Sequence, residues 1–117
     1  MKTHISSEVF DQYLKIRISG ENIYDEISEI LTTIKRLYDE NKRTKILIDG
    51  VDTPNLRTME RFSIGEMGLD VFDRNIKIAI FSKPENVNKF LETVVVNRGG
   101  NLLVTGNEQE ARDWLLK

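Results

Sequence analysis

The second half of the chain twice repeats one pattern, in which a short apolar strand leads through a helix-start signal into an amphipathic helix. A β-branched run at residues 76–81 precedes Ser82-Lys83-Pro84 and a helix that we expect to end before Gly99, with Ser82 as its cap. A second run at residues 102–104 precedes Asn107 and a closing helix. Strands joined through helices pair in parallel, so the pattern predicts an α/β fold.

The first half of the chain begins with a predicted hairpin. Residues 9–18 alternate weakly in polarity around a turn near Asp11-Gln12, which favours two antiparallel strands. Residues 22–40 carry apolar side chains at intervals of three and four, which predicts a helix with one buried side.

A central strand at residues 45–50 and a second helix at residues 57–73 complete the predicted elements. Gly65 and Gly68 each lower the propensity of that helix by about 1 kcal/mol relative to alanine, so a packing gain must offset them. The predicted order is β-β-α-β-α-β-α-β-α. It gives one mixed sheet, antiparallel in the N-terminal hairpin and parallel elsewhere, with about four helices in a single domain over residues 1–117.

Composition excludes several classes of function. Seventeen Lys and Arg against nineteen Asp and Glu give a formal net charge of −2, which offers no electrostatic basis for binding nucleic acid or an anionic membrane. The absence of cysteine excludes thiol catalysis and thiolate metal sites, and the single histidine, His4, has no triad or metal-ligand spacing around it. We therefore expect no cofactor, no metal and no enzymatic activity.

Hydropathy predicts a protein of the cytoplasm. No run of 18 apolar residues is present, and residues 1–4 lack the apolar stretch of a signal peptide. We accordingly expect no membrane insertion.

Polar residues follow three of the predicted strands and form a candidate ligand site. Ligands of open α/β sheets tend to bind beyond the carboxyl ends of the parallel strands. The acid, hydroxyl and lysine groups at these ends could accept a phosphoryl group on Asp49, or bind an anion, a nucleotide or a lipid. Polar strand ends are also typical of any α/β domain, so both interpretations stay open. The candidates are Asp49, Asp52, Ser82, Lys83, Thr105 and, as a guanidinium for an anion, Arg98.

The second predicted helix carries two sets of apolar residues. We expect one set, Phe62, Gly65, Leu69 and Phe72, to face the core, and the glycines to allow close approach of a neighbour. The second set would then form an exposed stripe, which would mark a partner surface. If the helix is broken at a glycine, both sets are buried instead. The stripe consists of Ile64, Met67 and Val71.

These elements resemble a known family. The strand Ile46-Leu47-Ile48-Asp49 before a loop and helix, the strand at 76–81 and the ending Glu108-Gln109-Glu110-Ala111-Arg112-Asp113-Trp114-Leu115 resemble a STAS-like domain. This is the fold of anti-sigma-factor antagonists, of cytoplasmic domains of sulfate transporters and of many small uncharacterised bacterial proteins. The resemblance covers nearly the whole chain through order and pattern.

The resemblance implies a regulatory domain that binds proteins through its second helix and the preceding loop. Regulatory members carry a phosphorylated serine in an Asp-Ser-Ser-Gly type motif at the start of that helix. Here Arg57-Thr58 occupies the corresponding position and Asp52-Thr53 lies nearby, so neither pair reproduces the motif. Thr58 and Thr53 are therefore the candidate phosphoacceptors, beside Asp49.

We thus expect a non-enzymatic domain that binds a partner protein or forms a homodimer through the second helix. The alternative is a phosphoacceptor or small-ligand domain that works at the strand ends.

Overall fold

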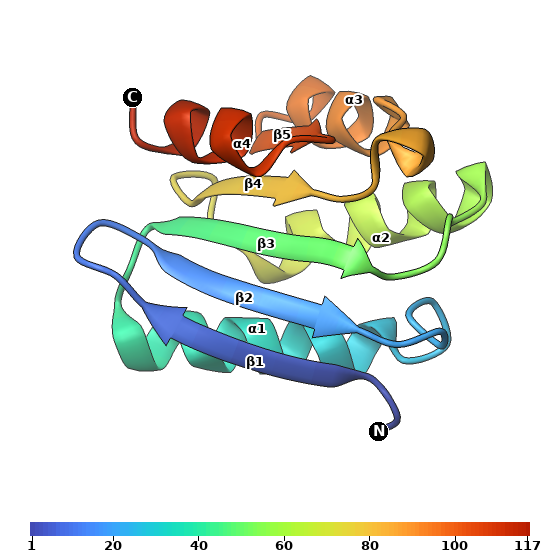
Figure 1. The fold of residues 1–117 in the computed structure, drawn as a ribbon, viewed down its shortest axis with the longest axis horizontal. Coiled ribbons are helices and arrows are strands. Elements are labelled where there is room, and N and C mark those ends of the chain that lie inside the picture. Colours follow the sequence, from blue (N-terminus) through green and yellow to red (C-terminus); the bar gives the residue numbers. More distant parts are fainter.

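A five-stranded mixed sheet organises the chain, and the computed structural model describes all 117 of its residues (Figure 1). The strands lie in the order in which they occur in the sequence, β1-β2-β3-β4-β5. β1 pairs with β2 in antiparallel orientation, and every other pair is parallel. The strands are β1 His4–Val9, β2 Leu14–Ser19, β3 Lys45–Asp52, β4 Lys77–Phe81 and β5 Asn101–Thr105.

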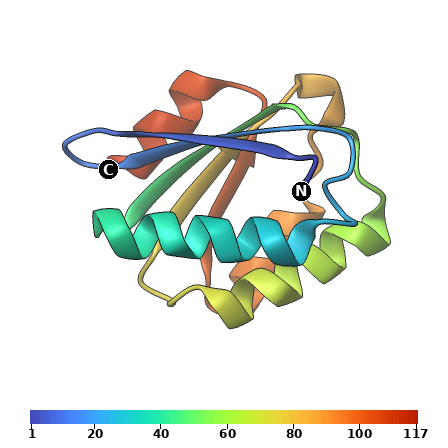
Figure 2. The ribbon, with the colours of Figure 1, turned by 90° about the horizontal axis from the view of Figure 1, so that it is seen from below.

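Helices cover both faces of the sheet. Figure 2 shows α1, α2 and α3 on one side and α4 on the other. The predicted order of strands and helices is confirmed. The helices are α1 Ile27–Asn41, α2 Thr58–Val71, α3 Phe90–Asn97 and α4 Glu108–Leu115, with a short 3-10 helix, η1, at Pro84–Asn86.

Two apolar clusters follow from the alternation of side chains along the strands. In β3, Ile46 and Ile48 point to the face covered by α1, and Leu47 points to the face covered by α4. The larger cluster joins these isoleucines to buried residues of β2 and α1 such as Ile16 and Ile30. The smaller cluster consists of Tyr13, Leu47, Ala79, Phe81, Ala111 and Leu115.

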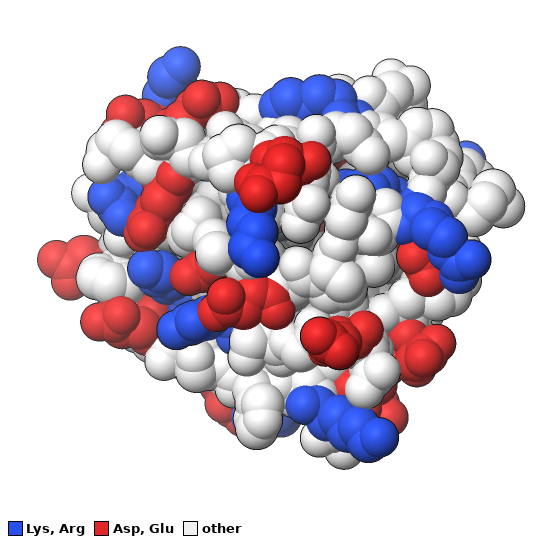
Figure 3. Space-filling model, turned by 45° about the vertical axis from the view of Figure 1, so that its right-hand side comes forward, with Lys and Arg blue, Asp and Glu red and all other residues white.

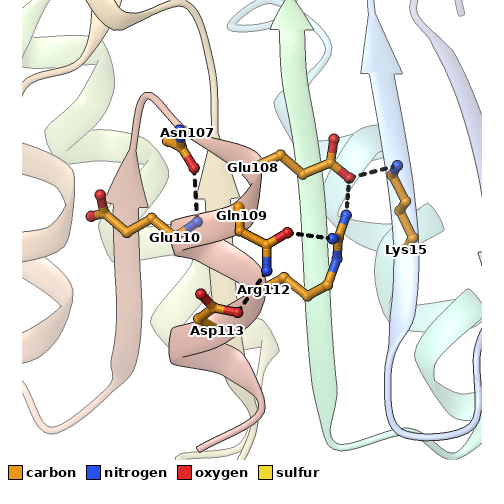
Figure 4. A network of polar contacts seen from close by, with 7 residues as sticks. All are labelled: Lys15, Asn107, Glu108, Gln109, Glu110, Arg112 and Asp113. Carbon is orange, nitrogen blue, oxygen red and sulfur yellow. Dashed lines mark hydrogen bonds and ion pairs between the residues drawn. The ribbon is translucent and has the colours of Figure 1, made fainter.

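α4 is fixed to the sheet by polar contacts as well as by its apolar side (Figure 4). The Asn107 side chain accepts a hydrogen bond from the backbone N–H of Glu110 at 2.9 Å, which confirms the predicted cap. The Glu108 carboxylate lies 3.1 Å from the Lys15 ammonium on β2 and 2.6 Å from the Arg112 guanidinium. The network ties the last helix to β2, which lies 93 residues earlier in the chain at Lys15.

The third predicted helix is divided in the structure. Residues 84–86 form η1, and α3 begins only at Phe90, whose backbone N–H donates to the Asn88 side chain at 3.0 Å. An asparagine that binds its own backbone two residues on competes with the helix, which explains the break. The prediction that Ser82 caps this helix is wrong, because Lys83 is the residue before η1, Lys89 is the residue before α3, and neither start has a side-chain cap. Gly99 has a φ of +87° directly after the helix, as predicted.

α1 starts five residues later than the predicted boundary at residue 22. Glu26, the residue before the helix, uses its carboxylate to accept hydrogen bonds from the Thr3 hydroxyl at 2.6 Å and the Lys2 N–H at 2.7 Å. This contact holds the N-terminal segment against the start of the helix. Ile23 remains buried although it lies in a turn.

α3 closes the outer edge of β5. The Glu92 carboxylate accepts a hydrogen bond from the Val104 N–H at 2.8 Å, and the Lys89 ammonium donates to the Val104 carbonyl. These two side chains occupy the outward backbone groups of Val104, which a further strand would otherwise bind. The other edge, along β1, has no such cover.

None of the helices has the length and apolar character needed to cross a bilayer.

Candidate functional site

The carboxyl edge of the sheet brings several of the predicted ligand residues together. Asp49 pairs in register with Phe81, and Phe81 with Thr105, so Asp49, Ser82 and Thr105 belong to neighbouring strand ends. The Ser82 N–H donates to the Thr105 carbonyl at 3.1 Å, which holds two of these ends against each other. The predicted proximity of the strand ends is therefore present.

Most of the polar groups at this edge already have partners within the chain. The Asp49 carboxylate accepts a hydrogen bond from the Val51 N–H at 3.1 Å, and the Thr53 hydroxyl donates to the Gly50 carbonyl at 2.6 Å. Asp52 pairs with Arg17, and that hydrogen bond raises the pKa of the arginine. These groups are therefore satisfied within the chain, and none of them lines the two cavities described below.

Lys83 and Thr105 differ in their exposure. Lys83 is exposed and makes no ion pair, whereas Thr105 is buried. Nowhere do three or more His, Asp or Glu side chains gather in a way that could hold a metal ion.

Arg98 does not belong to this edge. It lies directly before β5, at the amino end of the parallel strands, and the prediction that groups it with Asp49 and Ser82 is wrong. Its guanidinium pairs with the Glu66 carboxylate and lies 5.6 Å from the centre of the Phe62 ring. The side chain connects α3 with α2.

The first turn of α2 presents the most exposed large apolar side chain of the protein. Met59 is 74% exposed, and Thr58 beside it is also exposed, with a hydroxyl that makes no hydrogen bond within the chain. The Glu60 carboxylate accepts a hydrogen bond from the Arg57 N–H at 2.8 Å and pairs with the guanidinium of the same residue at 3.1 Å. Both contacts lower the pKa of Glu60, the guanidinium having the larger effect. The helix start is rigidly capped while its side chains face solvent.

A polar hollow of about 200 Å³ lies beside this turn. It separates the loop before α1 from the loop before α2. Three carboxylates and no basic residue line it, and of the three only Glu60 has an ion-pair partner. Its lining residues are Glu21, Asn22, Tyr24, Asp25, Pro54, Asn55, Leu56 and Glu60. We call Met59, Thr58 and this hollow the α2 entry surface.

Charges of both signs are interspersed over the part of the molecule that includes the carboxyl edge (Figure 3). Uncharged surface separates them, and neither sign forms a continuous field. The distribution favours specific contacts over electrostatic attraction to a polyanion.

The apolar stripe predicted on α2 is not exposed. Ile64, Met67 and Val71 are half-buried and pack against the larger apolar cluster. Successive residues of a helix are rotated by about 100°. The side of α2 that faces the core lies between the two apolar sets, so each set is partly covered and neither points straight into solvent. The first apolar set is half-buried as well, apart from the buried Gly65, and the predicted break at a glycine is absent because α2 is continuous.

Sequence analysis missed Arg61, a charged residue that is only 7% exposed. Its guanidinium donates to the Leu56 carbonyl at 3.0 Å, the Asn55 side chain at 2.8 Å and the Asn86 carbonyl at 3.1 Å. Burial lowers the pKa of Arg61, and no carboxylate pairs with it. The sequence feature that could have predicted this burial is the spacing of four residues between Arg61 and Gly65, which places both on the same side of the helix. Arg61 joins the loop before α2 to η1.

Comparison with solved structures shows where this fold occurs elsewhere. An anti-sigma factor antagonist from Mycobacterium paratuberculosis is 10% identical, with a TM-score of 0.69 over 98% of this chain and 95% of that one. The anti-sigma factor antagonist SpoIIAA in its unphosphorylated form is 14% identical, with a TM-score of 0.55 over 97% and 96% of the two chains. An uncharacterized protein with a SpoIIAA-like fold from Shewanella loihica is 17% identical, with a TM-score of 0.50 over 97% and 93%.

No family model matches the sequence, and none of the curated proteins is similar to it in sequence. The likeness is therefore one of fold, and it confirms the STAS-like architecture expected from the order of the elements.

Proposed function

From the STAS-like fold that this chain shares with anti-sigma-factor antagonists, we propose that it is a non-enzymatic regulatory domain that binds a partner protein through the α2 entry surface. One observation carries the proposal: Met59 exposes 74% of its surface at the start of a capped helix. Large apolar side chains on a rigid support are typical anchors of protein interfaces.

The α2 entry surface favours a partner of particular chemistry. Met59 is a flexible apolar side chain that fits a hydrophobic pocket of the partner. The hollow beside it contains Glu21 and Asp25, which lack ion-pair partners within the chain and favour a basic side chain. We infer a partner that presents an apolar pocket flanked by lysine or arginine. A second copy of this chain is the other partner to be tested.

Binding experiments with paired variants test this proposal. Partners captured from the native host are identified by mass spectrometry, and their affinity is then measured with purified protein. We expect Met59→Asp to keep the circular dichroism spectrum and to weaken binding at least tenfold. Val96→Asp is the matched control, because Val96 is 49% exposed on α3, away from the α2 entry surface. Equal affinity of both variants would contradict the proposal, and sedimentation of the protein alone tests the homodimer.

Thr58 is the favoured phosphoacceptor of this domain. Of the three candidates, it alone is exposed and free of hydrogen bonds, whereas the Thr53 hydroxyl binds the Gly50 carbonyl and the Asp49 carboxylate binds the Val51 N–H. A phosphate at the first position of a helix is stabilised by the free N–H groups there. The lysine or arginine that we infer on the partner would attract the added negative charge beside Met59, so phosphorylation would strengthen binding. Thr58→Glu should therefore strengthen binding, and Thr58→Val should leave it unchanged.

The strand ends support the alternative function less well. Asp49 is half-buried and Asp52 is paired, so an incoming phosphoryl group would have to break existing contacts. Incubation with acetyl phosphate and Mg²⁺ followed by intact mass measurement tests this alternative directly. A phosphoryl adduct that forms on the original chain and not on Asp49→Asn would establish the phosphoacceptor function. It would then be favoured over partner binding through the α2 entry surface.

A further inference from the structure

An apolar cavity of about 100 Å³ lies between the sheet and the helices α2 and α3. Its wall combines branched side chains of the strands with one side of α2. A cavity of roughly 150 Å³ with a similar lining stays dry and binds benzene, so this one has room for an apolar group of about four to six carbons. The main lining residues are Ile78, Ile80, Leu102, Ile64, Leu69 and Phe72.

Gly68 keeps this cavity open. Gly65, one turn earlier, is explained by packing, because a Cβ there would lie 3.0 Å from Val94. A Cβ at Gly68 would meet no atom within 4 Å, although the residue lies on the cavity side of the helix. A glycine in a helix lowers stability by about 1 kcal/mol relative to alanine, and no neighbour of Gly68 compensates for that loss. The missing side chain leaves volume that a bound group would occupy.

The mouth of the cavity carries a cation with unused hydrogen-bond donors. Asp73, Arg74 and Asn101 are exposed and line the cavity at the amino end of β4 and β5. The Arg74 guanidinium donates to the Arg98 carbonyl but forms no ion pair. A guanidinium has five N–H donors, so Arg74 retains enough to bind a carboxylate or phosphate.

We propose that this cavity binds a small amphiphile, with an apolar tail of about four to six carbons against Gly68 and an anionic end at Arg74. The site is separate from the α2 entry surface, and it holds whether or not a partner protein binds there.

Calorimetric titration of the full chain with straight-chain carboxylates from butanoate to decanoate tests the tail. Each methylene that enters the cavity should raise affinity about fourfold, and the gain should stop near hexanoate, where the cavity is full. Absence of saturable binding for every member of the series would overturn the proposal.

Two leucine variants of α2 locate the site. Gly68→Leu fills the cavity and should weaken hexanoate binding at least tenfold. Asp70→Leu, the matched control, adds the same side chain at an exposed position of α2 outside the cavity lining and should bind as the original chain does. Unchanged binding by Gly68→Leu would overturn the proposal. If Gly68→Leu does not fold, the same titration with Gly68→Ala tests the proposal. One added methyl group should shorten the tightest-binding carboxylate by about one or two carbons, and an unchanged preference would overturn the proposal.

Arg74→Gln tests the anionic end. It should weaken hexanoate binding and leave binding of 1-hexanol, which has the same tail and no charge, unchanged. Loss of both ligands, or of neither, would overturn the assignment of Arg74.

Discussion

Arg61 shows how one buried charge holds a loop in place. Its guanidinium is satisfied by three oxygen acceptors, from Asn55, Leu56 and Asn86, and by no carboxylate. The planar fork of arginine holds its five donors in fixed directions, so it binds acceptors on two segments at once. Arg61 thereby connects the loop before α2, which forms part of the α2 entry surface, to the segment after β4.

Replacing Arg61 should destabilise the protein strongly. Arg61→Ala leaves three oxygen acceptors without their donor and a void in the core side of α2, so we expect a loss of about 2 to 4 kcal/mol in the free energy of unfolding. Urea denaturation followed by circular dichroism measures it. The control is Arg36→Ala, which removes an exposed ion pair within α1 and should cost at most about 0.5 kcal/mol. Similar losses for the two variants would contradict the role given to Arg61.

Glu26 should make the anchoring of the N-terminus dependent on pH. Hydrogen bonds from the Thr3 hydroxyl and the Lys2 N–H hold the pKa of its carboxyl below the usual 4.5. A lowered pKa means that the contact contributes fully above about pH 4.5 and is lost as pH falls through the folded-state value. Hydrogen exchange at the Lys2 and Thr3 amides should accelerate in acid relative to exposed amides. Glu26→Gln should exchange quickly at every pH, and slow exchange in that variant would exclude this mechanism.

At the scale of elements, the two glycines of α2 should respond oppositely to the same substitution. Gly65→Ala places a methyl 3.0 Å from Val94 of α3, and the overpacking should outweigh the gain in helix propensity, for a net loss of about 1 kcal/mol. Gly68→Ala meets open space and should stabilise the helix by about 0.5 to 1 kcal/mol. Thermal unfolding of both variants gives the comparison. If both variants were stabilised, or both destabilised, the distance between α2 and α3 would differ from the one described.

The same helix shows what sequence can and cannot predict about an element. Periodicity and glycine content gave the existence of α2 and its close approach at Gly65, because both depend on local spacing. Which side of the helix is buried depends on where α1 and α3 lie, so the exposed stripe at Met67 was predicted wrongly. The break before Phe90 was missed because Asn88 reads equally well as a helical surface residue until its side chain is seen to bind the backbone.

At the scale of the molecule, one sheet carries two apolar clusters on opposite faces. β3 supplies Ile46 and Ile48 to one and Leu47 to the other, so neither cluster can be lost without disturbing the strand. We therefore expect both faces to unfold together.

Leu115→Ala tests that coupling. Leu115 is fully buried on the α4 side, and its truncation should cost about 2 to 5 kcal/mol. The urea midpoint should fall equally by Trp114 fluorescence, which reports on α4, and by far-ultraviolet circular dichroism, which reports on the whole chain. Separate midpoints would show that α4 unfolds on its own.

The topology of the whole molecule was predictable because alternating strand and helix patterns restrict how a sheet can be connected. The candidate site was predictable only in part. Position in the sequence placed Asp49 and Ser82 at one edge, but it could not show that Asp49 binds its own backbone or that Arg98 reaches Glu66. Partners of polar side chains depend on contacts between segments far apart in the chain, and a cavity has no pattern in the sequence at all.

The Glu92 and Lys89 side chains that occupy the border of β5 also limit how copies of this protein can associate. We therefore expect strand addition at β1 and not at β5. In a pair of molecules joined along β1, the β5 edges would face outward, and their occupied Val104 backbone would oppose the addition of a third molecule. We therefore expect such growth to be disfavoured beyond a pair, which limits the risk that the polar β1 edge seeds fibres.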